Sequence, residues 1–167
     1  MERVAGETTS NVRETIAPRI RWMVARDLLD VMSIERRSFE FPWTERDFDH
    51  VLSRRNCIGM VAELWNGIGG FMIYELERKR IHVLNFAVAQ AARRQGVGSQ
   101  LVAKLVNKLS QQRQRIHLEV RERNLPAQLL FRAMRFRAVA VLHGFYEETL
   151  EDAYVFERRA LKVIPHA

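Results

Sequence analysis

The feature that most constrains the fold is a buried strand, a glycine turn and an amphipathic helix in immediate succession. The run 81–88 (IHVLNFAV) is largely apolar, which indicates a strand inside a sheet. The turn RRQGVG follows it. Beyond the turn, apolar residues recur at helical intervals, at Val97, Leu101, Val102, Leu105, Val106 and Leu109. The segment therefore predicts a mixed α/β sheet protein.

The rest of the chain gives the order β-α-α-β-β-β-α-β-α-β-β. Alternating apolar residues and the hairpin signal Asn66-Gly67 predict strands at about 20–24, 57–65, 68–76, 81–88, 116–120, 136–142 and 153–157. Asp27 and Thr44 are suitable N-caps for the first two of four helices, at about 28–38, 45–54, 97–109 and 126–134. This order predicts a mostly antiparallel mixed sheet with helices packed on it.

Length and composition are those of one globular domain. The chain has 167 residues, and we expect a flexible extension over 1–18, a domain over 19–162 and a tail over 163–167. The absence of an export signal or a long apolar run predicts a cytoplasmic protein without a membrane partner. The single cysteine, Cys57, forms no intrachain disulfide and is expected to be a small buried side chain. The five histidines lack metal-ligand spacing, so we expect no metal.

The net charge of +7 concerns partners rather than fold. It is compatible with a polyanionic ligand, an acidic peptide or RNA. It is equally compatible with an arginine-rich surface that only reflects the composition of the genome. Because no nucleic-acid-binding motif is present, we expect no direct reading of nucleic acid.

The turn itself suits an anion. Gly96 and Gly98 let the backbone approach a pyrophosphate at a helix N-terminus, and Arg93 and Arg94 add charge. The segment is neither a P-loop nor a dinucleotide-binding fingerprint, since neither spacing is met. The alternative is a tight strand-to-helix turn with a solvated basic rim.

Five segments taken together resemble the GCN5-related N-acetyltransferases, over about residues 19–158. They are FPWTERDF, NFAV, RRQGVG, LEVRERN and a late aromatic pair. FPWTERDF and LEVRERN narrow the resemblance to the RimI type, which acetylates the N-terminal alanine of a small-subunit ribosomal protein. The resemblance implies a sheet of about seven strands that splays between the fourth and fifth, with about four helices.

The resemblance also implies acetyl-CoA as cofactor and assigns residues to it. The backbone of the strand before the turn pairs with the pantetheine, and the turn holds the pyrophosphate. The implied cofactor-binding residues are Phe86, Ala87, Val88, Arg93, Arg94, Gln95, Gly96, Val97, Gly98, Ser99, Asn124 and Phe131.

Glu119 matches the catalytic glutamate of the family. An ammonium group must lose a proton before it attacks a thioester, and a carboxylate is a suitable base. At pH 7 this costs only about 1.4 kcal/mol for an α-amino group but roughly 4–5 kcal/mol for a lysine amine. The alternative for Glu119 is a strand glutamate that faces solvent or pairs with arginine.

The chain departs from the RimI type at Phe131, where the family has the tyrosine that protonates the leaving thiolate. Water or another tyrosine could take that role. Tyr146, in HGFYEE, is expected first in the peptide site and second as a replacement acid. Met134-Arg135-Phe136 also replaces the family's Leu-Gly-Phe.

The acceptor side is implied by the same resemblance. Phe41, Pro42 and Trp43 are expected to wall the peptide entrance, with a packed corner between two helices as the alternative. We therefore expect an acetyltransferase that acts on a protein N-terminus, for example of a small-subunit ribosomal protein. The rivals are acetylation of a lysine or a small amine, a CoA-binding module with weakened catalysis, and an RNA- or ribosome-binding domain.

Overall fold

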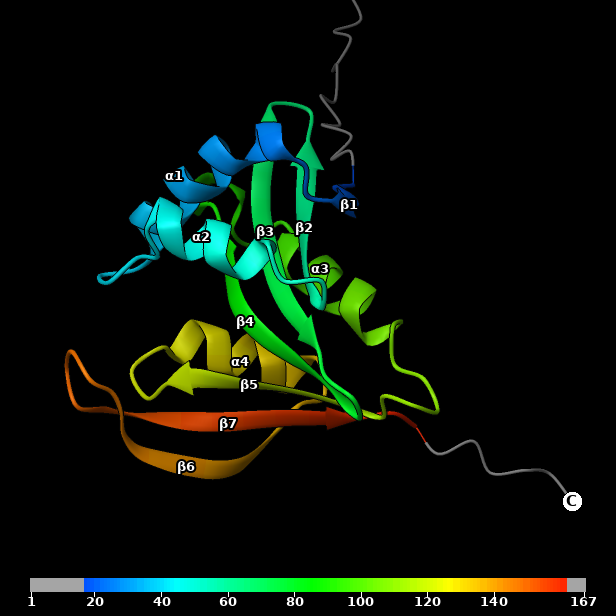
Figure 1. Cartoon of the computed structure of the whole chain (residues 1–167), viewed down its shortest axis with the longest axis vertical. Helices are drawn as coiled ribbons and strands as arrows, with labels where there is room; N and C mark the ends of the chain where they lie inside the picture. Colours follow the sequence, from blue (N-terminus) through cyan, green and yellow to red (C-terminus); the bar gives the residue numbers. More distant parts are fainter. Residues whose placement is uncertain (1–16, 162–167) are drawn as a thin grey trace, which may run out of the picture.

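One mixed sheet organises residues 17–161, the part of the chain that the computed structural model describes (Figure 1). Its seven strands lie in the order β1-β2-β3-β4-β5-β7-β6. They are β1 (Arg19–Trp22), β2 (Cys57–Leu64), β3 (Gly67–Leu76), β4 (Arg80–Val88), β5 (Arg115–Arg121), β6 (Arg137–Tyr146) and β7 (Glu151–Arg159). Only β4 and β5 pair in parallel, so the expected mixed, mostly antiparallel sheet is confirmed.

Helices cover both faces of this sheet. They are α1 (Leu28–Ser38), α2 (Glu45–Leu52), α3 (Val97–Val106) and α4 (Leu125–Ala133), with short 3-10 turns at Ala25–Asp27 and Gln90–Ala92. Strand β3 shows how the faces divide. Phe71 and Ile73 pack with α1 and α2, whereas Met72 and Tyr74 pack on the opposite face with residues of α3 and α4. The sheet is thus the shared centre of two apolar layers.

The sheet opens between β4 and β5. These strands pair only from Arg80 to His82 and from Arg115 to His117, and then diverge (Figure 1). Within the diverging part, β4 has one extra residue relative to β3. Ile73 of β3 pairs with Asn85, but the next residue, Tyr74, pairs with Val83. Such a bulge bends a strand and redirects its side chains. The splay expected between the fourth and fifth strands is therefore present.

Local signals in the sequence correspond to these elements, but several ends differ. Strand β1 and helices α2 and α3 end at Trp22, Leu52 and Val106, earlier than expected. Thr44 caps α2 by accepting a hydrogen bond from the backbone N–H of Asp47. Asp27 stands at the N-cap of α1, but its carboxylate binds Arg21 and the Val24 N–H instead of capping the helix. The last two strands are longer than expected. Strand β6 continues through HGFY to Tyr146, and β7 runs from Glu151 to Arg159.

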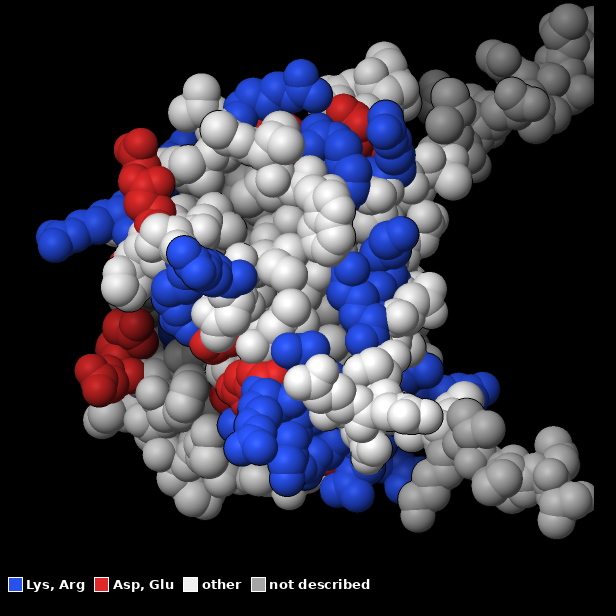
Figure 2. Space-filling view, turned by 45° about the vertical axis from the view of Figure 1, so that its right-hand side comes forward, with Lys and Arg blue, Asp and Glu red and all other residues white. Residues whose placement is uncertain are grey.

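The expected extension over 1–18 and tail over 163–167 lie almost entirely outside the described residues. Within the described part, none of the helices has the length and apolar character needed to cross a membrane. Figure 2 shows Lys and Arg side chains in several separate groups on one face, with Asp and Glu between some of them. That face therefore does not form one continuous basic surface.

Candidate active site

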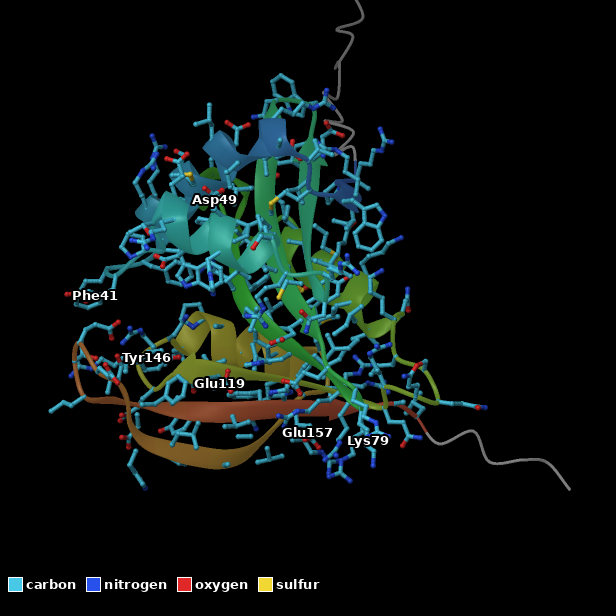
Figure 3. The ribbon with its side chains drawn as sticks, viewed as in Figure 1. Phe41, Asp49, Lys79, Glu119, Tyr146 and Glu157 are labelled. Atoms are coloured by element: carbon cyan, nitrogen blue, oxygen red, sulfur yellow. The ribbon has the colours of Figure 1, made fainter. Side chains whose placement is uncertain are left out.

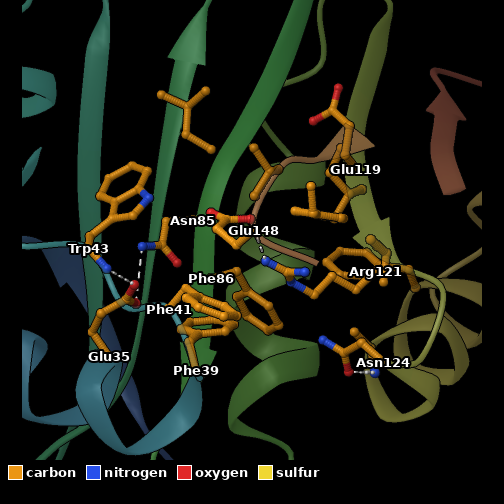
Figure 4. A pocket seen from close by; sticks show the side chains of 17 residues that line it. Glu35, Phe39, Phe41, Trp43, Asn85, Phe86, Glu119, Arg121, Asn124 and Glu148 are labelled. Carbon is orange, nitrogen blue, oxygen red and sulfur yellow. Dashed lines mark hydrogen bonds and ion pairs between the residues drawn. The ribbon is translucent and has the colours of Figure 1, made fainter. Parts of the chain in front are cut away.

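A cavity of about 340 Å³ lies where β4 and β5 separate. This volume is in the range of small-molecule sites. Figure 4 shows Glu35, Trp43 and Asn85 on one side of it and Glu119, Arg121 and Asn124 on the other. Side chains from α1, β4, β5, α4 and the end of β6 therefore converge on one space.

Glu119 lies in this cavity on β5, and its side chain is only 19% exposed. Its Oε2 atom is 2.7 Å from Nε2 of His82 on β4. Burial raises the pKa of Glu119, but the hydrogen bond with His82 and the charges of His82 and His117 outweigh it and lower that pKa below its usual value. The glutamate is thus an ionised, hydrogen-bonded group in a half-closed site.

His82 has close neighbours on two further sides. Its ring stacks on that of His117, with centroids 4.2 Å apart, and its Nδ1 lies 3.8 Å from a carboxylate oxygen of Glu77. Burial, together with the charges of His82 and Arg80, lowers the pKa of His117, which favours a neutral ring. The sequence did not reveal that these residues meet.

The same three residues are close enough to be considered as a metal site. Glu77, His82 and His117 each offer an atom within 4.8 Å of the others. However, the two rings are stacked only 16° from parallel, and the in-plane lone pairs of stacked rings do not converge on one ion. Nε2 of His82 is also engaged by Glu119. We therefore assign His82 to its hydrogen bond with Glu119.

The loop between α1 and α2 forms one rim of the cavity. Phe41 is exposed and faces the same opening as Tyr146, with Glu119 further inside (Figure 3). Trp43 has two roles, since it lines the cavity and also packs edge-on against Phe48 at 5.3 Å. Pro42 is half-buried beside them but does not line the cavity. The loop thus lines the cavity through Phe41 and Trp43 and also packs against α2 through Trp43, while a role at a peptide entrance stays a prediction.

Glu35 holds that loop against the sheet. It is 1% exposed, and its two oxygens accept hydrogen bonds from the Trp43 N–H at 2.8 Å and from Asn85 Nδ2 at 3.1 Å. Burial raises the pKa of Glu35, and the two hydrogen bonds only partly offset this effect. The sequence analysis missed Glu35. A signal was present, because it lies four residues after Val31 and so on the buried face of α1.

Arg121 crosses the mouth of the cavity and was also missed, although it belongs to the LEVRERN segment. Its guanidinium lies 3.7 Å from the ring centroid of Tyr146 and 5.9 Å from that of Phe41. It is also 3.6 Å from Glu148 and 3.2 Å from Glu151. Burial is the main cause that raises the pKa of Tyr146 to about 12. Arg121 therefore lies between Tyr146 and Phe41, the aromatic side chains on the two sides of the opening.

The turn at 93–98 has the backbone that a glycine permits. Gly96 is the N-cap of α3 in the left-handed region, with φ of 78°, and Arg94 also has a positive φ of 60°. The first N–H groups of a helix have no partner within it, so those of Val97, Gly98 and Ser99 are available to a ligand. Arg93, Arg94 and Gln95 are exposed around them, although Nε of Arg93 also donates to the Val88 carbonyl at 3.2 Å.

Gly98 has a packing role that the sequence did not suggest. A Cβ atom at this position would lie 3.1 Å from Leu130 and 3.3 Å from Phe86. The glycine therefore lets α3 approach both α4 and β4. On β4, Phe86 and Val88 pack on this side, while Ala87 points into the opposite layer.

Asn124 and Phe131 lie on the α4 side of the cavity. Asn124 caps α4 through a hydrogen bond from the Ala127 N–H to its Oδ1 at 3.2 Å. Phe131 is 1% exposed and packs edge-on against Phe86 and Phe136, with ring centroids 5.6 Å and 5.2 Å away. Its ring is part of the apolar wall and carries no group that can donate a proton.

Several known proteins are similar to this chain in sequence or fold. Residues 28–136 match the model of the acetyltransferase (GNAT) family. The ribosomal protein bS18-alanine N-acetyltransferase of Escherichia coli (strain K12) is 29% identical over 133 residues, which is 77% of this chain and 88% of that protein. An N-alpha-acetyltransferase of Sulfolobus acidocaldarius is 24% identical over 163 residues, 89% of this chain and 96% of its own length. The crystal structure of Ard1 from Thermoplasma volcanium has a TM-score of 0.79 at 26% identity, with 88% of this chain and all of that chain covered.

Proposed function

The chain belongs to the acetyltransferase (GNAT) family and transfers acetyl from acetyl-CoA to an amine, and we propose that this amine is the α-amino group of a protein N-terminus. The names of the relatives support this acceptor. The similarity to the Escherichia coli enzyme supports, more specifically, an N-terminal alanine such as that of a small-subunit ribosomal protein. We propose residues 19–162 as the catalytic domain.

We assign the cofactor to the turn and to the free edge of β4. The N–H groups of Val97, Gly98 and Ser99, with Arg93, Arg94 and Gln95 around them, suit a pyrophosphate. The edge of β4 from Phe86 to Val88 is free of β5 and suits an extended amide chain. Asn124 and the ring of Phe131 border the same space. When bound, acetyl-CoA supplies the acetyl group as a reactive thioester.

The single observation that carries the proposal is an ionised carboxylate inside the cavity, with an aromatic rim outside it. Glu119 takes the proton from the acceptor ammonium, which leaves a nucleophilic amine. Phe41, Trp43 and Tyr146 are positioned to contact the first residues of a peptide. Proximity then allows direct transfer without an acyl-enzyme.

The position of Phe131 bears on how the thiolate leaves. Tyr146 is a poor acid because its pKa is raised to about 12. A thiol has an ordinary pKa of about 8.5, so a thiolate is already a tolerable leaving group near neutral pH. We therefore assign Tyr146 to the peptide site and propose that the thiolate is protonated by water. The alternative that this observation favours is a CoA-binding module with weakened catalysis.

A thiol-release assay tests the acceptor and the alternative together. The acceptors are a short peptide that begins with alanine, the same peptide with a blocked N-terminus, and a blocked peptide that contains lysine. Turnover of the free peptide alone supports the proposal, and turnover of the blocked lysine peptide contradicts it. If wild type is silent and Phe131→Tyr is active, the weakened-catalysis alternative is correct.

A further inference from the structure

Basic side chains from three separate segments gather at one end of the sheet. The segments are the turn at 77–80 between β3 and β4, the loop at 110–115 before β5, and the end of β7 at 157–159. Their basic residues, which we call the basic edge, are Arg78, Lys79, Arg80, Arg113, Arg115, Arg158 and Arg159. Figure 3 labels Lys79 and Glu157 at this end, and Figure 2 shows a group of Lys and Arg side chains at the same lower end of the molecule. The residues of the basic edge do not line the cavity, so this surface is separate from the proposed active site.

Hydrogen bonds join the three segments to one another. The Gln114 N–H donates to the Lys79 carbonyl at 3.2 Å, and the Ala160 N–H donates to the Gln114 carbonyl at 2.8 Å. Nε of Arg113 also donates to the Glu77 carbonyl at 2.8 Å. The basic edge is therefore one connected surface, although its residues are far apart in sequence.

Strand register places three of these arginines in one row. Arg80 of β4 is opposite Arg115 of β5, and Arg115 is opposite Arg159 of β7. Neighbouring strands are only about 4.8 Å apart, and directly opposite residues point to the same face of a sheet. Like charges in such positions destabilise the sheet. The row therefore disfavours the isolated fold, and local conflicts of this kind are typical of functional sites.

The acidic residues of the three segments only partly neutralise the row. Glu77 pairs with Arg80, whereas Glu157 is shared by Arg159 at 2.8 Å and Arg115 at 3.9 Å. The side chains of Arg80, Arg115 and Arg159 remain 50%, 44% and 73% exposed, respectively. Because Glu77 and Glu157 are the acidic residues of these segments, most of the positive charge of the basic edge is available to a partner.

We propose that the basic edge binds the phosphate backbone of a nucleic-acid duplex. A guanidinium group presents paired N–H donors that match a phosphate, and a duplex offers phosphates in an unbroken series. The three segments consist of Arg, Lys, Glu, Gln and Ser residues. They thus lack the aromatic rings that hold single strands by stacking and the apolar side chains that enter a membrane. This inference is independent of the acceptor proposed above.

The loop at 110–115 gives a reason to compare RNA with DNA. Gln111 and Gln112 are exposed in it, beside the arginine row. A glutamine amide both donates and accepts hydrogen bonds, as does the ribose 2′-OH that distinguishes RNA from DNA. We therefore expect an RNA duplex to bind more tightly than a DNA duplex of the same sequence. Equal affinities also support the proposal and assign the binding to the phosphates alone.

Fluorescence anisotropy with labelled RNA and DNA hairpins of one stem sequence tests the proposal on the full chain. Wild type should bind with a Kd of about 1–100 μM, and the affinity should fall as salt rises. Arg80→Gln, Arg115→Gln and Arg159→Gln combined should weaken binding at least about tenfold and reduce the slope of log K against log salt by about three. Wild type that binds neither hairpin at up to about 100 μM protein overturns the proposal.

A matched control separates the basic edge from net charge. Arg36→Gln, Arg37→Gln and Arg46→Gln combined remove the same charge from exposed positions of α1 and α2. This variant should keep the wild-type affinity and salt slope. If it loses as much affinity as the row variant, binding depends on net charge and the basic edge is not a site.

A second variant avoids the paired arginines, in case the row variant does not fold. Arg78→Gln and Lys79→Gln combined change two exposed side chains of the β3–β4 turn. They should weaken hairpin binding and leave thiol release with the alanine-initiated peptide unchanged. Unchanged hairpin affinity in this variant contradicts the proposal. A protein that binds the hairpins but acetylates none of the peptides rejects the proposed function and supports this inference.

Two other polyanions test the choice of partner. They are vesicles of phosphatidylcholine with phosphatidylserine, which present a membrane, and polyglutamate, which presents an acidic protein chain. Both should bind more weakly than the hairpins at the same salt concentration. Tighter binding to the vesicles means that the basic edge faces a membrane, and tighter binding to polyglutamate means that it faces an acidic protein. Either result overturns the proposal.

Discussion

The turn at 93–98 and the pocket around Glu119 lie at two ends of the same opening in the sheet. The turn presents backbone groups, whereas the pocket presents side chains. The turn offers backbone N–H groups of one contiguous segment, and its shape depends on the conformation of Gly96. The pocket is assembled from side chains of α1, β4, β5 and β6 that are far apart in sequence. A backbone site tolerates many side chains and fails when φ is changed. A side-chain site fails when one functional group is lost.

The largest expected effect is on the pocket. Glu119→Gln keeps the size of the side chain and removes the base, so kcat should fall about 10²- to 10⁴-fold. Because the substitution leaves the turn intact, the affinity for acetyl-CoA measured by calorimetry should not change. Glu122→Gln, an exposed glutamate three residues further on, is the control and should match wild type. Equal losses of kcat and cofactor affinity in Glu119→Gln would show that the two ends are not independent.

The second effect concerns the loop that forms the pocket rim. Glu35→Ala leaves the Trp43 N–H and the Asn85 amide without their acceptor. Each unpaired buried donor costs about 1–3 kcal/mol, so the free energy of unfolding in urea should fall by about 2 kcal/mol or more. KM for the peptide should rise more than KM for acetyl-CoA. Glu40→Ala, an exposed neighbour, serves as control, and a Glu35→Ala variant with wild-type stability and peptide KM would remove Glu35 from the site.

The difference between the two regions also explains what the sequence could predict. The turn, the helix that follows it and the hairpin at Asn66-Gly67 depend on neighbours in sequence, and their signals are local. Glu119 and the aromatic rims were found only through a resemblance. The contact of His82 with Glu119 and the bond from Asn85 to Glu35 join residues 37 and 50 positions apart, respectively, so they depend on strand register and on the β4 bulge. Neither register nor a bulge has a period that can be read from the chain.

Strand length is a second example. The sequence suggested that the sixth strand ends near Leu142. In the structure β6 continues to Tyr146, with Gly144 at a positive φ of 59° and its N–H bound to Asp152 of β7. The hydrogen bond to Asp152 thus compensates for the irregular backbone at Gly144. Because the strand continues, Tyr146 reaches the cavity.

The third effect tests the turn. Gly96→Val forces a branched side chain into a backbone with φ of 78°, although a Cβ there would meet only Gln100 at 3.9 Å. The cost is therefore conformational, about 1–3 kcal/mol. We expect KM for acetyl-CoA to rise roughly tenfold and KM for the peptide to stay the same in steady-state assays.

Gly67→Val is the matched control for this substitution. Gly67 also has a positive φ, of 128°, with nothing within 4 Å of an added Cβ, but it lies in the hairpin between β2 and β3. It should lower stability without a change in KM for acetyl-CoA. If both variants change only stability, the backbone of the turn does not hold the cofactor.

The smallest effect compares two buried carboxyl groups whose pKa values move in opposite directions. The hydrogen bond from Arg21 is the main cause that lowers the pKa of Asp27, so its contribution to stability is present above about pH 4 and is lost as the pH falls through the folded-state pKa. Burial raises the pKa of Glu35, so ionising it opposes folding, and stability falls as the pH rises from about 4 through its folded-state pKa. In urea unfolding, the stability advantage of wild type over Asp27→Asn should grow from pH 2 to 5. The advantage of wild type over Glu35→Gln should shrink from pH 4 to 7. If both stability advantages grew with pH, the folded protein would favour the charged form of Glu35 as it does that of Asp27. The carboxylate of Glu35 would then stabilise the rim of the pocket when ionised.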